Sequence, residues 1–293
     1  IDIPNSITAI SNKTFYACVS LTYVTIPNSV LNIASEAFAG CKSLVSLAIP
    51  NSVICIEPST FSRCTSLVSV IIPNSVTTLG TDAFYYCTSL ASVTIPDSVV
   101  FFGSNPFGYC SGLEAFYGKY ATEDNRCLVV DGVLISFAPF GISEYTIPDC
   151  VHRIGDFAFV NIESLSSVVI SSSVTEIGHR AFYFSTVESV DIPNSVLYLE
   201  YEAFGYCYKI KKVKVSNPNP NNISLEDDLI FTGVNETPCV LYVPEGSKQL
   251  YAAATAWSKF NNIEEFTYDP IIFSAKNEDG VTIDYNMTSE ANK

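Results

Sequence analysis

The chain has 293 residues, of which 48% are hydrophobic and 15% charged, so its composition excludes intrinsic disorder and permits a large core. The net charge is −15 and no basic stripe is present, which argues against nucleic acid as a partner. No apolar run approaches the roughly 20 residues that a membrane-spanning helix requires. The chain opens on IDIPNSI, the middle of a repeated pattern without a secretory signal, so we expect a mature or excised fragment.

The dominant pattern is an internal repeat with a period of 23 residues. It is marked by isoleucine-proline pairs, which begin at Ile3, Ile26, Ile49, Ile72 and Ile95 and continue at Ile147, Ile170 (without the proline), Ile192 and, as a weaker echo, Val215. Self-similarity at such a period is typical of a solenoid, in which each unit buries its apolar residues against its neighbours. We therefore predict that residues 1–216 form one solenoid of about eight to nine coils.

One unit shows how a coil is built. Residues 67–73, LVSVIIP, alternate between inward apolar and outward positions as a β-strand does, and the proline ends the strand. Residues 76–80, VTTLG, predict a second short segment with a sharp corner at its glycine. Ala83 and Phe84 are expected in a single helical turn, and Cys87 is expected to point inward.

The spacing A-F-x-x-C-x-x-L-x-x-V-x-I-P resembles the BspA-like leucine-rich repeats of bacterial surface proteins. The match is best from Ala37 to Pro50 and from Ala83 to Pro96, and the chain departs from it at Pro106, Ile162 and Ser185. The resemblance implies an α+β leucine-rich-repeat solenoid whose parallel strands stack on one face.

Cysteines recur at the same point of the repeat, at Cys18, Cys41, Cys64, Cys87 and Cys110. Disulfides, a metal site, a catalytic thiol and core packing are the alternatives. Stacked coils lie roughly 4.8 Å apart and hold parallel side chains, whereas a disulfide requires Cβ atoms about 3.8 Å apart and zinc requires converging ligands. We therefore expect core packing and free thiols; a pairing among Cys55, Cys127, Cys150 and Cys239 stays open.

The repeat is interrupted at about residues 116–145. Within this segment, Leu128–Val130 and Val133–Phe137 flank Asp131-Gly132, which predicts a β-hairpin. We expect an elaboration of one coil, with a binding projection as the alternative.

The C-terminal part departs from the repeat. Residues 217–266 predict a strand-and-helix cap, with a helix over 246–260, Ser247 as its N-cap, and Leu250, Tyr251, Ala254 and Trp257 on one buried face. Residues 267–293 match no repeat and form either a tail or the truncated start of a further module.

Motifs for catalysis, cofactor binding or metal binding are absent from the sequence. His152 and His179 fall at outward repeat positions without a positioned partner, and adjacent acidic pairs lack the spacing of a calcium loop. An enzyme would need carboxylates or aromatic residues converging on one pocket, which the repeat does not predict.

Two surfaces remain as binding candidates. Outward positions of the stacked strands give a face of small residues with a basic edge, and the binding candidates on it are Tyr23, Thr25, Ser69, Ile71, Ser92, Thr94, Ser167, Val169, Lys212 and Lys214. A set of tyrosines lies beside the cysteines, at Tyr16, Tyr85, Tyr86, Tyr109, Tyr206 and Tyr208. These rings either cover the edges of the coils or form a binding surface.

The resemblance implies a non-enzymatic interaction module that is displayed at a bacterial cell surface or secreted. It implies adhesion to a host matrix or plasma protein or to other cells, with a glycan as an alternative ligand and with no cofactor. The competing hypothesis is a structural spacer that holds another module away from the surface.

Overall fold

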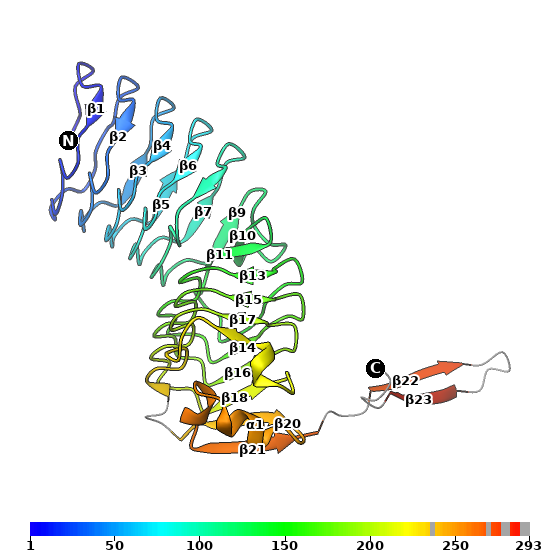
Figure 1. The fold of residues 1–293 in the computed structure, drawn as a ribbon. Coiled ribbons are helices and arrows are strands. Elements are labelled where there is room, and N and C mark those ends of the chain that lie inside the picture. The colour runs from blue at the N-terminus through cyan, green and yellow to red at the C-terminus, as the bar shows by residue number, and fades with distance from the viewer. Residues whose placement is uncertain (235–237, 268–270, 277–281, 288–293) are drawn as a thin grey trace.

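The computed structural model describes residues 1–234, 238–267, 271–276 and 282–287. The chain winds into a curved β-solenoid of about 11 turns, with coils of about 23 residues (Figure 1). The predicted repeat solenoid is confirmed, but the predicted number of coils is too low. Segments near the C-terminal end that lack the repeat pattern still stack, because strands with a different sequence pair with the last recognisable coil.

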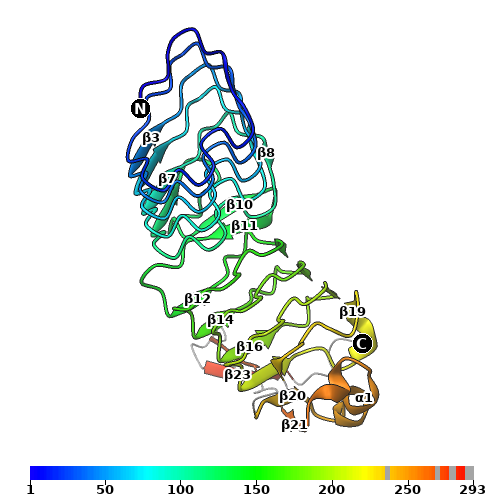
Figure 2. The same ribbon diagram turned by 90° about the vertical axis from the view of Figure 1, so that its left-hand side faces the viewer.

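Each regular coil contributes to two parallel ladders of strands on opposite sides of the coil (Figure 2). In the N-terminal half the long strands are β3 (Ser46–Ala48), β5 (Ser69–Ile71), β7 (Ser92–Thr94) and β9 (Ala115–Tyr117). The short strands are β1 (Ala9–Ile10), β2 (Asn32–Ile33), β4 (Cys55–Ile56), β6 (Thr78–Leu79) and β8 (Phe101–Phe102).

The C-terminal half continues the same plan. Its long strands are β12 (Glu144–Thr146), β14 (Ser167–Val169), β16 (Ser189–Ile192), β18 (Lys212–Val215), β20 (Val240–Pro244) and β21 (Asn262–Phe266). Its second ladder contains β10 (Cys127–Val130), β11 (Val133–Phe137), β13 (Arg153–Ile154), β15 (Glu176–Ile177), β17 (Tyr198–Leu199) and β19 (Ser224–Leu225).

The strands predicted for the repeat unit that starts at Leu67 are confirmed, but the conformation predicted for its corners is wrong. Val70 is buried between exposed Ser69 and Ile71, as strand alternation requires. The glycine at residue 80 serves close packing, because a Cβ there would lie 2.5 Å from the backbone nitrogen of Pro58. The segment around Ala83 and Phe84 is not helical, since Asp82 (φ 54°) and Tyr86 (φ 60°) both adopt the left-handed conformation.

A column of phenylalanine rings runs through the core. Phe84 is fully buried, and its ring is stacked on Phe61 and Phe107, each at a centroid distance of 5.4 Å. Equivalent rings form further stacked pairs, Phe15–Phe38, Phe38–Phe61, Phe159–Phe182, Phe182–Phe204 and Phe204–Phe231. The column therefore places a large aromatic side chain in successive coils, where the rings stack on one another.

After the first coil, each repeated cysteine forms a hydrogen bond with the backbone carbonyl of the phenylalanine in the preceding coil. The Cys64 thiol donates to the Phe38 carbonyl at 3.3 Å, and the Cys87 thiol donates to the Phe61 carbonyl at 3.3 Å. The same contact recurs at Cys41, Cys110 and Cys207. All ten cysteines lie in the described part of the chain and are free, as predicted for the repeated ones. Core packing is confirmed for the buried Cys41, Cys64, Cys87 and Cys110, whereas Cys18 in the first coil is exposed. A cysteine suits this position because it is small and still donates a weak hydrogen bond to a buried carbonyl.

The interruption divides the core into two clusters of buried residues, one from Ile10 to Ala138 and one from Cys127 to Ile263, which overlap in the hairpin. The hairpin pairs β10 with β11 in antiparallel fashion around Asp131 and Gly132, both of positive φ. Strand β11 also pairs in parallel with β13. The hairpin therefore begins the second ladder of the C-terminal half rather than projecting from the stack.

The C-terminal segment has less helix than the sequence indicated. Helix α1 (Lys248–Ala253) ends before Ala254, which is extended, and a 3₁₀ helix covers Trp257–Lys259. Ser247 occupies the N-cap position without a side-chain capping bond, and Leu250 is exposed. A second 3₁₀ helix covers Pro220–Asn222, so the predicted α+β class gives way to a β-solenoid with few helices.

The buried Trp257 ring contacts Phe231, the last ring of the column, at 5.3 Å. That this segment caps the stack stays a prediction. Within the predicted tail, β22 (Ile271–Lys276) and β23 (Thr282–Met287) form an antiparallel pair, which Figure 1 draws beyond the last coil. The other residues after 267 lie outside the described residues.

We expect Phe84→Ala to lower the free energy of unfolding by about 3–5 kcal/mol, because it leaves a cavity in the ring column. Phe101→Ala is the matched control, since its ring is 67% exposed and its loss should change stability by no more than about 0.5 kcal/mol. Urea unfolding measures both values. Equal, small changes would show that the ring column contributes little.

We also expect the thiols to differ in reactivity. Burial raises the pKa of the Cys41 thiol to about 11 and that of Cys64 to about 12, which keeps both protonated at neutral pH. Iodoacetamide should modify exposed Cys18 and Cys150 in the native protein and all ten cysteines after denaturation without reductant. Mass analysis that finds two or more disulfides among the repeated cysteines would contradict the free-thiol assignment.

Candidate functional site

The predicted strand face, defined as the outward side of the long strands, is solvent-accessible in both halves. Tyr23, Thr25, Ser69, Ile71, Ser92, Thr94, Val169 and Lys212 are exposed, and Ser167 and Lys214 are half-buried. Within the N-terminal half, β5 pairs with β3 and places Ile71 beside Ala48, while β7 pairs with β9 and places Thr94 beside Tyr117. The residues of the C-terminal half lie on a separate sheet, so the structure brings the predicted face together as two patches.

The predicted basic edge is largely neutralised. Lys211 pairs with Glu188 at 2.7 Å, and Lys214 lies 3.8 Å from Asp191 on the preceding coil. The Lys212 and Lys214 ammonium groups also lie over the rings of Tyr242 and Phe266. Each acidic partner lies 23 positions before its lysine, a signal that was present in the sequence.

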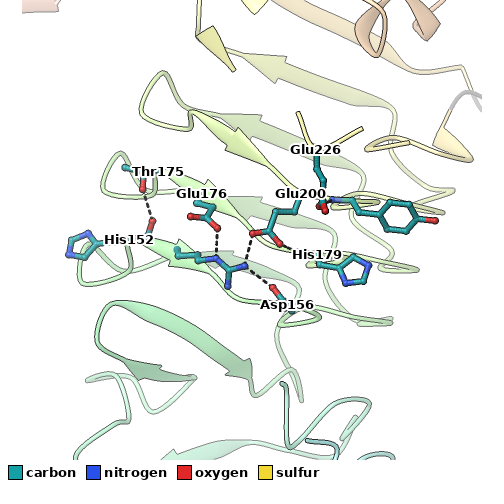
Figure 3. Close-up of polar contacts among 9 residues, drawn as sticks. His152, Asp156, Thr175, Glu176, His179, Glu200 and Glu226 are labelled. Atoms are coloured by element: carbon teal, nitrogen blue, oxygen red, sulfur yellow. Dashed lines mark hydrogen bonds and ion pairs between the residues drawn. The ribbon is translucent and has the colours of Figure 1, made fainter. Parts of the chain in front are cut away.

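The structure reveals a charged cluster that the sequence analysis missed (Figure 3). Arg153 contacts Glu176 at 2.6 Å, Glu200 at 2.7 Å and Asp156 at 2.8 Å, and so joins three successive coils. Partial burial would raise the pKa of Glu176, but hydrogen bonds with Glu200 and Arg153 lower it instead. All three carboxylates are paired with one guanidinium, so the arrangement is a structural ion-pair network.

The two histidines contribute no catalytic pair. His152 is exposed, whereas the half-buried His179 ring lies between Phe157 and Tyr201 at centroid distances of 5.2 Å. Among the described residues, no group of three His, Cys, Asp or Glu side chains could hold a metal ion.

The predicted tyrosines form two aromatic groups on the edge of the solenoid beside the cysteines. Tyr85, Tyr86 and Tyr109 pack together in the N-terminal half, with the Arg63 guanidinium 5.9 and 5.8 Å from the centres of the first two rings. In the C-terminal half, Tyr206 and Tyr208 pack with Tyr183 and Phe184. Tyr16 stands apart in the first coil and is exposed.

A cleft lies where the two halves meet, and we call it the junction cleft. Its larger lobe has a volume of about 480 Å³ and is lined by residues that include Tyr86, Tyr109, Phe140, Asn161 and Glu163. Its smaller lobe, of about 280 Å³, is lined by residues that include Asp82, Tyr85, Tyr109, Phe157, Arg180 and Tyr183. Tyr109 lines both lobes. The junction cleft thus gathers aromatic side chains from both halves of the chain.

Asn105 fixes the two sides of this cleft. Its amide nitrogen donates to the Phe157 carbonyl at 2.6 Å, and its amide oxygen accepts from the Ser136 hydroxyl at 2.5 Å. The side chain is buried and therefore bonds an N-terminal coil to the hairpin and to a C-terminal coil in a low-dielectric environment.

Several aromatic residues near the cleft have an unfavourable backbone conformation. Glycine holds one corner of the coil at Gly40 (φ 77°) and Gly233 (φ 81°). The other coils hold the same corner with residues other than glycine, and these include Tyr86 (φ 60°), Tyr109 (φ 61°), Phe184 (φ 57°) and Tyr206 (φ 55°). A left-handed conformation costs a residue other than glycine about 1–2 kcal/mol, so the packing of these side chains must offset that cost.

A stack of parallel coils with strands on two sides is a β-solenoid. The chain belongs to the family described as BspA type leucine-rich repeat region, whose model matches residues 1–114 and 135–232 with six copies. The matched ranges stop and resume at the interruption.

Solved structures show the same fold. A leucine-rich cell surface protein from Faecalibacterium prausnitzii is 25% identical, with a TM-score of 0.58 over 90% of this chain and 78% of that one. A leucine-rich repeat protein from Eubacterium ventriosum is 16% identical, with a TM-score of 0.61 over 88% of this chain and 78% of that one. The pneumococcal vaccine antigen PcpA is 17% identical, with a TM-score of 0.59 over 92% of this chain and 79% of that one.

None of the curated proteins matches the chain. Within the described ranges, no helix has the length and apolar character needed to cross a membrane.

We expect the Arg153 network to make stability depend on pH. The pKa of Glu176 is lowered on folding from 4.5, so its contribution is present above that value and is lost as the pH falls through the lowered pKa. Glu176→Gln should reduce the unfolding free energy by about 1 kcal/mol at pH 7, a figure that allows for partial solvent screening, and by less in acid. Urea titrations at several pH values test this, with exposed Glu144→Gln as control. A loss that is equal at all pH values would contradict it.

Proposed function

We propose that this protein is a non-enzymatic interaction module at a bacterial cell surface that binds an extracellular protein through its strand face. The supporting observation is the character of the N-terminal patch of that face. Ile71 is 68% exposed and Tyr23 is 57% exposed, and exposed Val45, Val68 and Tyr117 lie on or beside the same strands. Exposed apolar side chains on regular parallel strands suit a protein partner better than a small ligand.

The charge distribution supports this choice of patch. Residues 1–100 carry only 5 acidic and 3 basic side chains, although the whole chain carries a net charge of −15. A weakly charged patch lowers the desolvation cost of burying a protein interface. Its tyrosines and Ile71 can serve as anchors, whereas the surrounding serines and threonines permit close approach.

A structural spacer is the second candidate. The pair β22 and β23 follows the last coil, which is where a spacer would lead into a further module. A spacer requires no ligand for its faces, so binding measurements separate the two hypotheses.

The test is binding to an immobilised panel of host matrix and plasma proteins, with bacterial cells as a second target. We expect saturable binding that weakens by at least about tenfold when Ser69, Ile71, Ser92 and Thr94 are all changed to glutamate, because buried unpaired charges oppose association. Leu31→Glu with Ile54→Glu is the matched control, since both residues are exposed apolar side chains outside the strand face.

Binding that resists the strand-face changes would place the interface elsewhere. Absence of binding to every target would favour the spacer.

A further inference from the structure

The junction cleft combines the two kinds of group that a small polar ligand requires. Tyr85, Tyr109 and Tyr183 supply ring surfaces, while Asp82 and Arg180 supply polar groups at the same lobe. The larger lobe adds Asn161 and Glu163 beside the exposed Tyr86 and Phe140. Pockets of this size with aromatic walls and few convergent polar groups are typical of ligand-binding sites.

The charges around the smaller lobe disfavour an ionic ligand. The Arg63 guanidinium already lies over Tyr85, and the Arg180 guanidinium lies 4.8 Å from the centre of the Tyr183 ring. A cationic ligand would therefore meet two like charges at the rings that could attract it. Arg180 is also paired with Glu202 at 2.7 Å, so it offers little attraction to an anion.

The remaining polar groups suit hydroxyl groups of a ligand. Among the residues that the structure describes, no side chain forms a hydrogen bond or ion pair with the half-buried Asp82 carboxylate, and its burial raises its pKa. Burial raises the pKa of the Tyr109 hydroxyl to about 12, so it stays protonated, and it is hydrogen-bonded to the Tyr85 hydroxyl in the same lobe. The Ser104 hydroxyl in the same wall is buried and has no partner within the described part of the chain.

We propose that the junction cleft binds a neutral oligosaccharide, whose apolar ring faces pack on Tyr85, Tyr109 and Tyr183 and whose hydroxyl groups bond to Asp82. Two lobes that share Tyr109 provide room for more than one sugar unit. The site lies apart from the strand face and does not depend on the function proposed for it.

The test is equilibrium binding to soluble neutral oligosaccharides of glucose, xylose, mannose and N-acetylglucosamine. Sialyllactose and an oligolysine peptide are tested in parallel as an anionic and a cationic ligand. We expect at least one neutral oligosaccharide to bind below about 1 mM and to bind at least about tenfold more weakly to Tyr85→Ala and Asp82→Asn. Tyr16→Ala is the matched control, because Tyr16 occupies the same repeat position as Tyr85 in the first coil, outside the cleft.

Tyr109→Gly is a further cleft variant that should keep the native fold. Gly40 and Gly233 hold the equivalent corner, so the variant should keep its melting temperature while losing binding. Three results would overturn the proposal: no neutral oligosaccharide binds, binding is unchanged by the cleft variants, or only the anionic or cationic ligand binds. The strand-face variants should leave oligosaccharide binding unchanged, which distinguishes failure of this proposal from failure of the strand-face interface.

Discussion

The structure depends on hydrogen bonding between successive coils, because a corner that turns inside a stack must pair its buried backbone groups with the neighbouring coil. Phe38 both donates and accepts such a bond. Its N–H donates to the Thr60 carbonyl at 3.0 Å, and its carbonyl accepts from the Cys64 thiol at 3.3 Å. Ser75 adds a third bond to the Val53 carbonyl at 2.7 Å. Each coil thus completes the previous one, and a repeated sequence is the simplest way to repeat those donors.

The interruption is informative because it breaks this rule once. The ladders of the N-terminal half end at β8 and β9, and those of the C-terminal half begin with β10 and β12. Between them, regular strand pairing gives way to isolated backbone hydrogen bonds, such as that from the Phe140 N–H to the Leu113 carbonyl at 3.0 Å, and to the side-chain bonds of Asn105. The coils there are not spaced by regular pairing, so a cleft forms between them and is lined by residues of both halves. The candidate ligand site is therefore a consequence of the break in the repeat.

The period of the sequence was sufficient to predict the strands, the inward residues and the free cysteines, because each is set by the pattern within one coil. Contacts between coils were harder to predict, although Arg153 and Glu176 lie 23 positions apart. The junction cleft was not predictable, since its walls lie 52 positions apart at Asn105 and Phe157 and depend on how the hairpin restarts the stack. The helix over 246–260 was overestimated because Ala254 adopts an extended conformation after one short helix.

The left-handed corners have a consequence for how this fold can change over time. At a corner held by Gly40 in one coil and by Tyr109 in another, the backbone path is the same although the side chains differ completely. Substitution there can alter the surface without repacking the phenylalanine column, because the Tyr109 ring packs on Tyr85 and Tyr86. Residues at these corners can therefore change during evolution, and alter which ligands bind, while the fold of the solenoid stays the same.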